Sequence, residues 1–311
     1  MRSPRASIAI CTYNGESRLP LVLDALIEQT APTTEWEVLV VDNASTDATA
    51  AVCDRYAAQG LPLRCISEMR PGLSYARECA ARNSSAPITC FLDDDNIPNA
   101  NFVEQVITIF DQYPKMGVAG SLVRPRWQSP PTELALAVAG FALAICDKGA
   151  EPIQLIGNAE GVVGAGMCAR TSVLQAALAD LIGNGDAKVS DRVGRDLIGG
   201  GDTAICILAR RAGHEIWYQP TLQIDHVMPD SRTQVDYLMQ LYAGIGRGQA
   251  ALRELLDPRA RNAGFRILLA AKDFLRWLKA KPGPARSAQT ELVLQQLDRA
   301  LILARAKQYL K

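Results

Sequence analysis

Phe91-Leu92-Asp93-Asp94-Asp95-Asn96-Ile97-Pro98 is the stretch that decides the fold of this chain. It continues an apolar run of β-branched and aromatic residues that begins at Ile88 and predicts a buried strand. A strand cannot carry three adjacent charges through a core, so we expect the acids at its exposed end. Three carboxylates at one point repel one another unless a cation lies between them. Oxygen ligands on a short loop suit Mg²⁺ or Mn²⁺ that also holds a substrate phosphate, although an isolated acidic triplet can also be a solvated turn.

Strand-like and helical segments alternate through the N-terminal part of the chain. Apolar runs predict strands at residues 6–11, 37–41, 63–66 and 88–92. Helical periodicity predicts helices at residues 18–30, 47–58 and 75–83, the second of them capped by Ser45 or Thr46. Such alternation predicts a parallel sheet with helices on both faces. Ligands bind outside the carboxyl ends of the strands in such sheets, so the polar residues after each strand should share one crevice.

Composition narrows the class of protein. The 311 residues contain 33 Lys and Arg against 33 Asp and Glu, so no overall positive field favours nucleic acid as a partner. The eight cysteines form no Cys-x-x-Cys pair and are typical of reduced, buried thiols in a cytosolic protein. No signal peptide is evident, and the longest uncharged apolar run, residues 134–146, is too short for a transmembrane helix. We therefore expect a cytoplasmic protein.

Four short motifs follow one another along the chain. They are Cys-Thr-Tyr-Asn at residues 11–14, Val-Val-Asp-Asn-Ala-Ser-Thr-Asp at 40–47, Pro-Gly-Leu-Ser-Tyr-Ala-Arg at 71–77 and Phe-Leu-Asp-Asp-Asp at 91–95. Over roughly residues 6–230, this order resembles the family 2 glycosyltransferases of the glycosyltransferase-A fold, of the type that builds polysaccharides. The resemblance implies an α/β fold with a Rossmann-like, mostly parallel sheet flanked by helices.

The resemblance also implies how the chain is divided. Residues 1–124 would form the half that binds the nucleotide-sugar donor, and residues 125–230 the acceptor-binding and catalytic half of the same domain. A proline-rich, polar stretch at residues 125–131 marks the change between them. Residues 231–311 carry helical patterns and are expected to form a C-terminal helical region.

The first motifs match nucleotide-binding residues of the family. The match implies that Thr12, Tyr13 and Asn14 line the base and ribose pocket. It implies that Asp42 accepts a hydrogen bond from a uracil N–H, a role that suits an ionised carboxylate, although Asp42 could instead belong to a helix cap and turn. Arg77 would support the acidic loop or contact phosphate, or else be a surface charge on its helix.

The acidic loop matches the metal site of the family. The match implies that Asp95 binds the ion directly and that Asp94 or Asp93 contacts the ribose. The ion, Mg²⁺ or Mn²⁺, would bridge the two donor phosphates and neutralise the charge that grows on the leaving diphosphate. His226 matches a histidine of many relatives and could join the metal or the diphosphate, whereas a lone histidine at a strand end is often structural.

Asp202 matches the catalytic base of the family. The family pattern is Gly-Glu-Asp, and here Gly201 replaces the glutamate while the aspartate is kept. An inverting transfer needs one base that takes the proton of the acceptor hydroxyl, and the leaving diphosphate needs a metal rather than a protein acid. The alternative is an acid that merely complements a helix dipole.

Four segments outside the motifs carry further predictions. Residues 162–169 predict a glycine-containing strand that floors the sugar pocket or belongs to the core. Residues 134–146 predict a helix that is buried rather than in a membrane interface, and residues 244–248 predict a break in a helix. Residues 261–281 carry six basic residues against one acid and predict an amphipathic helix. That helix would pack on its own domain or bind an anionic membrane, which would make the protein peripheral at the inner face of the cell membrane.

The sequence therefore predicts a metal-dependent inverting glycosyltransferase of the hexosyl- or N-acetylhexosaminyl-transferase class. Its donor would be a nucleotide diphosphate sugar, a UDP-sugar in the first instance, and its acceptor a hydroxyl of a glycan or lipid-linked glycan. A nucleotidyltransferase is an alternative, but such enzymes usually carry a glycine- and arginine-rich phosphate loop where this chain has residues 12–15. A nucleotide-binding or partner-binding module without catalysis is supported only by Gly201.

Overall fold

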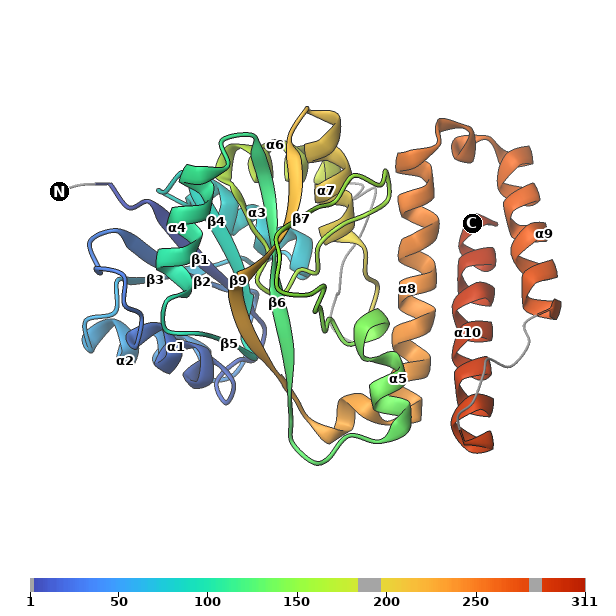
Figure 1. The fold of residues 1–311 in the computed structure, drawn as a ribbon, viewed down its shortest axis with the longest axis horizontal. Helices are drawn as coiled ribbons and strands as arrows, with labels where there is room; N and C mark the ends of the chain where they lie inside the picture. Colours follow the sequence, from blue (N-terminus) through green and yellow to red (C-terminus); the bar gives the residue numbers. More distant parts are fainter. Residues whose placement is uncertain (1–2, 184–196, 280–286, 311) are drawn as a thin grey trace.

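The computed structural model describes residues 3–183, 197–279 and 287–310. In the described residues, nine strands form one sheet, and three long C-terminal helices pack beside it (Figure 1). The strands are β1 Ala6–Thr12, β2 Trp36–Asp42, β3 Leu63–Ser67, β4 Ile88–Asp93, β5 Asn96–Pro98, β6 Met116–Trp127, β7 Ile153–Gln154, β8 Cys168–Arg170 and β9 Glu215–Met228. Their order across the sheet is β3-β2-β1-β4-β8-β6-β9-β5, with β7 paired to β9.

The described helices connect these strands and then extend beyond the sheet. They are α1 Leu19–Ile27, α2 Thr49–Ala58, α3 Leu73–Asn83, α4 Phe102–Gln112, α5 Glu133–Ala142, α6 Thr171–Ile182, α7 Gly201–Arg211, α8 Val235–Leu256, α9 Ala263–Lys279 and α10 Ala288–Tyr309. Two short 3-10 helices, η1 Asp230–Thr233 and η2 Pro258–Arg261, flank α8. Within the described ranges, every helix is either too short or too polar to span a lipid bilayer.

The first four strands form the predicted parallel sheet. β1 lies between β2 and β4, and β2 pairs with β3, all in parallel. Short β8 runs antiparallel to both β4 and β6, while β6 and β9 run parallel to each other. The prediction of a mostly parallel sheet with helices on both faces is confirmed, because alternate residues of the central strands enter two different cores.

Side chains alternate between these two cores along each buried strand. Ile8 and Ile10 of β1 pack with α1, α2 and α4 on one face. Ala9, Val41 and Phe91 pack with α3, α6 and α7 on the other face. Because both faces are covered, the polar residues that interrupt these runs come to lie at the strand ends, where the chain leaves the sheet.

The C-terminal unit contains α8, α9 and α10, and a third cluster joins it to α5 and the end of β9. The predicted break at Gly244–Gly248 is wrong, because α8 continues through these residues. The glycines serve close packing instead. A Cβ on Gly244 or Gly248 would lie 1.9 Å from Leu197 O or 1.6 Å from Gly199 O, and one on Gly246 would lie 2.2 Å from a carbonyl oxygen of α10.

Several local predictions need correction. Residues 162–167 are not a strand: only β8 is regular there, and Gly166 turns the chain at φ +70°. Neither Ser45 nor Thr46 caps α2, because Ser45 Oγ accepts the N–H of Asn14 instead. The proposed boundary at residue 125 lies within β6, and the division into a donor half and an acceptor half stays a prediction.

Two predictions about surface helices are partly confirmed. The helix predicted at residues 134–146 ends at Ala142, and one of its faces is buried while Leu136 and Phe141 remain more than half exposed. In α9, Ala270 and Asp273 face the interior, whereas the apolar stripe that includes Ile267 and Leu275 faces outward. Residues 280 and 281 of that predicted helix lie outside the described residues.

Candidate active site

The acidic triplet lies where β4 ends. Asp93 is the last residue of β4, and β5 begins at Asn96. β5 pairs antiparallel with β9 in a register that places Asn96 opposite His226. The pairing continues through Asp95, whose carbonyl oxygen accepts the N–H of Val227 at 2.9 Å. The sheet thus brings together the two residues that the sequence predicts as metal ligands.

Both carboxylate oxygens of Asp94 are engaged within the protein. Arg18 donates from Nε to Oδ1 at 2.9 Å and from Nη2 to Oδ2 at 2.8 Å. Thr12 Oγ1 donates to Oδ2 at 2.5 Å. The hydrogen bond to Asp94 raises the pKa of Arg18 above its ordinary value. Thr12 and Arg18 therefore fix the acidic loop, and the predicted ribose contact of Asp94 or Asp93 stays a prediction.

Arg232 lies between Asp95 and His226. Its Nη2 donates to Asp95 Oδ2 at 2.6 Å, and its Nη1 lies 2.9 Å from His226 Nε2. Asp95 Oδ1 in turn lies 3.4 Å from the same nitrogen. A guanidinium has only donors, so Nε2 presents its lone pair to Arg232 and the proton of a neutral imidazole is on Nδ1. Burial alone would lower the pKa of Arg232, but the charges of Asp95, Tyr237 and Asp93 hold it above its ordinary value.

Asp95 and His226 fit a divalent ion that is shared with a substrate. Both side chains are almost fully buried, at 6% and 3% exposed, and they offer one carboxylate and one imidazole lone pair to the same point. A cation, the Arg232 guanidinium, already lies at that point. Across the described ranges, no cluster of three or more His, Cys, Asp or Glu is placed to hold a metal alone. Mg²⁺ and Mn²⁺ in nucleotide sites commonly take the rest of their ligands from substrate phosphates and water.

A cleft of about 570 Å³ opens beside this cluster. It is lined by the three acids and Arg232, by the end of β1, by Pro71 and Gly72 of the loop before α3, and by Leu73 at the start of α3. Asn43 holds that loop, because its Nδ2 donates to two loop carbonyl oxygens and its Oδ1 accepts the N–H of Gly72 at 2.8 Å. Tyr13 lines the same cleft and is 52% exposed, so its ring is accessible to a ligand.

Asn14 and Asp42 join the loops that follow β1 and β2. Asn14, at φ +50°, accepts the N–H of Thr46 through Oδ1 at 2.8 Å. Asp42 Oδ1 accepts the N–H of Ser45 at 3.0 Å, beside the cleft-lining Asn43. The turn that the sequence offered as the alternative for Asp42 is therefore present. Contact of either side chain with a base stays a prediction.

Arg77 is buried at 5% exposure, which excludes the surface-charge alternative. Its guanidinium stacks over the Phe91 ring at 5.4 Å and lies against Gly164. A Cβ at Gly164 would be 2.4 Å from Arg77 Nη2 and 3.5 Å from Asp202 Oδ2. Arg77 therefore lies close to the predicted base, and Ala76, the residue before it, lines the cleft.

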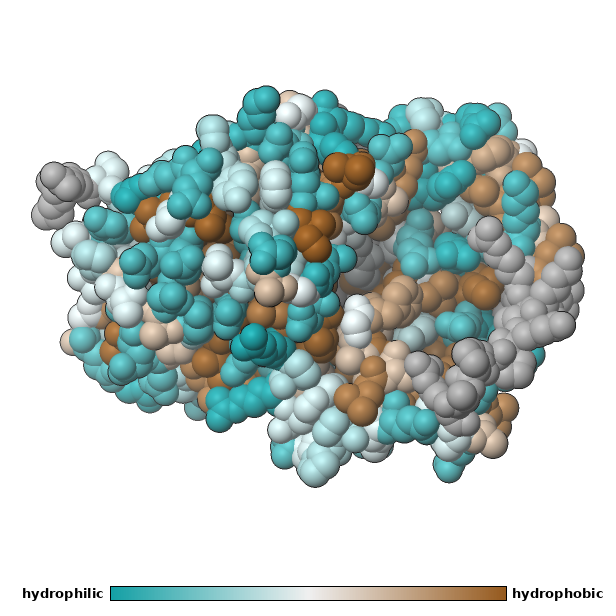
Figure 2. All heavy atoms as spheres, in the orientation of Figure 1, coloured by the Kyte–Doolittle hydropathy of each residue, from teal (hydrophilic) through white to brown (hydrophobic). Residues whose placement is uncertain are grey.

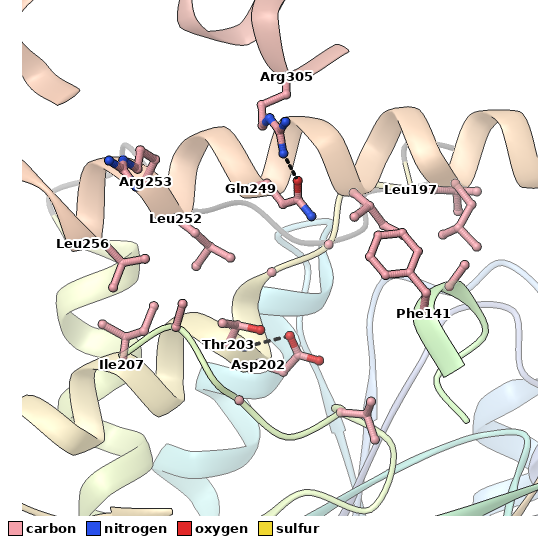
Figure 3. Close-up of a pocket in the computed structure, with 18 of the residues that line it drawn as sticks. Phe141, Leu197, Asp202, Thr203, Ile207, Gln249, Leu252, Arg253, Leu256 and Arg305 are labelled. Carbon is pink, nitrogen blue, oxygen red and sulfur yellow. Dashed lines mark hydrogen bonds between the residues drawn. The ribbon is translucent and has the colours of Figure 1, made fainter. Parts of the chain in front are cut away.

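Asp202 is the second residue of α7. Its Oδ2 accepts the N–H of Gly164 at 2.9 Å, and its Oδ1 accepts the N–H of Thr203 at 2.7 Å. It lines a second cavity, drawn in Figure 3, rather than the cleft beside the acids. The structure therefore gathers Thr12, Tyr13 and the acidic triplet around one cleft and places Asp202 in the next cavity.

The sequence missed three residues of this site. Arg18, Asn43 and Arg232 hold the acidic loop, the loop before α3 and the Asp95–His226 pair. Arg18 could have been suspected from the three adjacent carboxylates at one strand end, because their mutual repulsion requires a cation nearby. Arg232 lies more than a hundred positions from Asp95, so nothing local in the sequence connects them.

Comparison with known proteins identifies relatives. The family model described as Glycosyl transferase family 2 matches residues 7–175. Glycosyltransferase AglE of Haloferax volcanii is 33% identical over 106 residues, which is 34% of this chain and 35% of AglE. Glucosyl-dolichyl phosphate glucuronosyltransferase of the same organism is 22% identical over 296 residues, with 92% of this chain and 90% of that protein covered. The matched segment spans only about a third of AglE, and 19% of TarS from Staphylococcus aureus.

Solved structures show which fold the chain shares. A mannosyltransferase from Pyrobaculum calidifontis, solved with GDP-Man and Mn²⁺, superposes with a TM-score of 0.62 at 17% identity, covering 99% of this chain and 88% of that one. Residues 1–349 of TarS, solved with UDP-GlcNAc, give 0.54 at 15% identity, covering 97% and 90%. The predicted glycosyltransferase-A fold is confirmed. Because the family model covers more than half of the 311 residues, the chain belongs to glycosyl transferase family 2.

Proposed function

We propose that this protein is a metal-dependent inverting glycosyltransferase that uses a UDP-sugar and a hydroxyl acceptor. The observation that carries the proposal is that Asp95 and His226 both contact the Arg232 guanidinium, beside a cleft on the carboxyl edge of the parallel strands. The related structures that hold UDP-GlcNAc, or GDP-Man with Mn²⁺, favour this use of the cleft.

The donor would lie in the cleft with its base against Tyr13 and the loop held by Asn43. Asp42 would accept from the uracil N–H, and Asp93 or Asp94 would contact the ribose. Asp95 and His226 would hold a divalent ion, which neutralises charge on the leaving diphosphate when it is bound. In this scheme the donor half is residues 1–124, and the catalytic half is 125–230.

Asp202 would act as the base. Two backbone N–H groups fix its oxygens, so the carboxylate is oriented before an acceptor arrives. Its carboxylate would take the acceptor hydroxyl proton while that oxygen attacks the anomeric carbon from the side opposite the diphosphate. Arg77 lies near Asp202 at Gly164 and would orient that carboxylate rather than react.

The acceptor would be a glycan or lipid-linked glycan at the cytosolic face of a membrane. The relative that matches 92% of this chain is named for a dolichyl phosphate acceptor, which favours the lipid-linked alternative. Ile267, Leu268 and Leu275 of α9 are about half exposed and would touch the lipid, with basic residues beside them.

A donor screen tests the proposal. The purified protein is incubated with Mn²⁺ and each of several UDP- and GDP-sugars, and release of the nucleotide diphosphate is measured. We expect one UDP-sugar to be hydrolysed, and Asp202→Asn to abolish transfer while UDP affinity is kept. Asp236→Asn is the matched control, because Asp236 is also an acid in the first turn of a helix but lines neither the cleft nor the cavity. Normal turnover by Asp202→Asn would remove Asp202 as the base.

A further inference from the structure

The cavity that Asp202 lines is larger and more apolar than a sugar needs. It measures about 770 Å³ and lies between α7 and the C-terminal helices. Figure 3 shows Asp202 and Thr203 below α8, with Ile207, Leu252 and Leu256 to one side and Phe141 and Leu197 to the other. Side chains from α5, α7, α8 and α9 therefore enclose one space with the predicted base at its edge.

The apolar wall of the cavity, formed by Ile245, Leu252 and Leu256 of α8, is fixed relative to Asp202. Gly244 and Gly248 of α8 let the segment at residues 197–199 lie directly against the helix. Gly200, at φ +129°, lies close to α8, because a Cβ placed on it would be 3.3 Å from Leu252 Cδ1. Helix α7 begins at the next residue. The helix that carries Ile245 and Leu252 is thus in contact with the turn that positions Asp202, so the wall and the base belong to one site.

The charges on this wall are largely compensated. Asp273 is 4% exposed and forms two hydrogen bonds with Arg305, at 2.7 and 2.9 Å. Arg305 also donates to Gln249 at 2.5 Å. Arg253, which pairs with Asp257 at 3.5 Å, and Lys272 are exposed and lie at the cavity border. A free glycan would leave many of its hydroxyls against Ile245, Leu252 and Leu256 without hydrogen-bond partners, at a cost in free energy.

We propose that this cavity binds the hydrocarbon segment of a lipid-linked acceptor whose sugar hydroxyl reaches Asp202. The acceptor class is a sugar joined to an isoprenoid or acyl chain, with any linking phosphate near Arg253 and Lys272. The inference rests on the proposed function for the role of Asp202, but the binding of the hydrocarbon does not depend on turnover. Figure 2 shows hydrophobic side chains along the C-terminal helices and beside the hollow between them and the sheet, which suits an amphiphile taken from a lipid surface.

A chain-length series tests the proposal by binding alone. Methyl, butyl, hexyl and octyl β-glucosides are titrated calorimetrically below their micelle concentrations, with UDP and Mn²⁺ present. Burial of each methylene in the cavity should tighten binding by up to about fourfold until the space is filled. Leu252→Asn and Leu256→Asn should flatten the dependence on chain length, because both leucines line the cavity. Leu303→Asn is the matched control on α10, outside the cavity lining.

The outcomes separate this inference from the proposed function. Binding that does not change with chain length would overturn the inference, even if a UDP-sugar is turned over. Chain-length dependence that persists in both cavity variants would also overturn it, because the alkyl chain would then bind elsewhere, such as the exposed face of α9. If no sugar nucleotide is turned over but the chain-length effect follows the cavity variants, the proposed function fails and the hydrocarbon site stands. UDP titration of each variant shows that its donor half is folded.

Discussion

Replacing Arg232 by methionine should make the donor-free protein bind Mn²⁺ more tightly. Arg232 now holds the point between Asp95 and His226, with a 2.6 Å charge-assisted hydrogen bond to the carboxylate. A divalent ion that uses the same oxygen and the same Nε2 lone pair must first displace the guanidinium. Methionine keeps much of the side-chain length and removes the competing charge.

The size of the effect follows from what the ion must displace. A hydrogen bond to a charged group contributes about 1.5–3 kcal/mol. In the native protein, Mn²⁺ binding is weakened by this amount, because the hydrogen bond between Arg232 and Asp95 must first be broken. Its loss in Arg232→Met should raise Mn²⁺ affinity by about 10- to 140-fold. Without metal, the same variant should be less stable by about 3–5 kcal/mol, because Asp95 keeps a buried charge with its main partner removed.

Electron paramagnetic resonance of free Mn²⁺ gives the affinity, and thermal unfolding with and without Mn²⁺ gives the stability. Arg18→Met is the matched control, because it removes an arginine from Asp94 but leaves the Asp95–His226 pair intact. That control should lose stability without gaining Mn²⁺ affinity. Unchanged or weaker Mn²⁺ binding by Arg232→Met would refute the idea that the guanidinium and the metal share one place.

Three other predictions test the packing, the surface and the pH response. Gly248→Ala should reduce transfer far more than UDP affinity, because its Cβ would lie 1.6 Å from a carbonyl oxygen in the segment that leads into α7. Kinetic and calorimetric assays measure the two effects. Gly140→Ala is the control, because its Cβ would have no atom nearer than 3.8 Å. The double variant Ile267→Glu/Leu275→Glu should co-sediment less with anionic vesicles, because both exposed apolar side chains are lost, while UDP binding is unchanged. Unaltered co-sedimentation would exclude α9 as the membrane contact. Burial would raise the pKa of Glu37, but hydrogen bonds from two serines and an arginine lower it, so its stabilising effect is present above pH ~4.3 and is lost as the pH falls through the folded pKa. Urea unfolding should accordingly show a smaller deficit for Glu37→Gln at pH 3 than at pH 7.

Strands β1, β2 and β4 could be predicted because they are mostly apolar runs followed by polar residues. The same reasoning failed at residues 162–169, because Gly166 provides a turn and a small, apolar composition does not distinguish a turn-rich segment from a strand. It also failed at residues 244–248. There, glycines in a helix suggest a break when seen alone, but their cost is offset by backbone contacts with α10 and with the segment before α7.

The site was predictable to the extent that its residues follow strands. Asp93, Asp94 and Asp95 lie at one strand end, and parallel pairing brings Thr12 to the same edge. Arg232 could not be found in this way, because it depends on the antiparallel pairing of β5 with β9 and on the turn η1 that follows. Side chains on long-range turns are set by tertiary contacts rather than by local patterns.

The division of the site into two spaces follows from the chemistry that we propose. An inverting displacement needs the attacking hydroxyl and the leaving diphosphate on opposite sides of the anomeric carbon, so the base and the diphosphate-binding cluster would lie on opposite sides of the sugar. Gly164 allows this arrangement, because a Cβ there would lie 2.4 Å from Arg77 Nη2 and would also contact Asp202 Oδ2 at 3.5 Å. The sugar would therefore be expected at this boundary, with the nucleotide in the cleft beside Asp95 and the acceptor in the cavity beside α8. A substitution at Gly164 should accordingly impair transfer while leaving both the binding of UDP and the binding of an alkyl glucoside measurable.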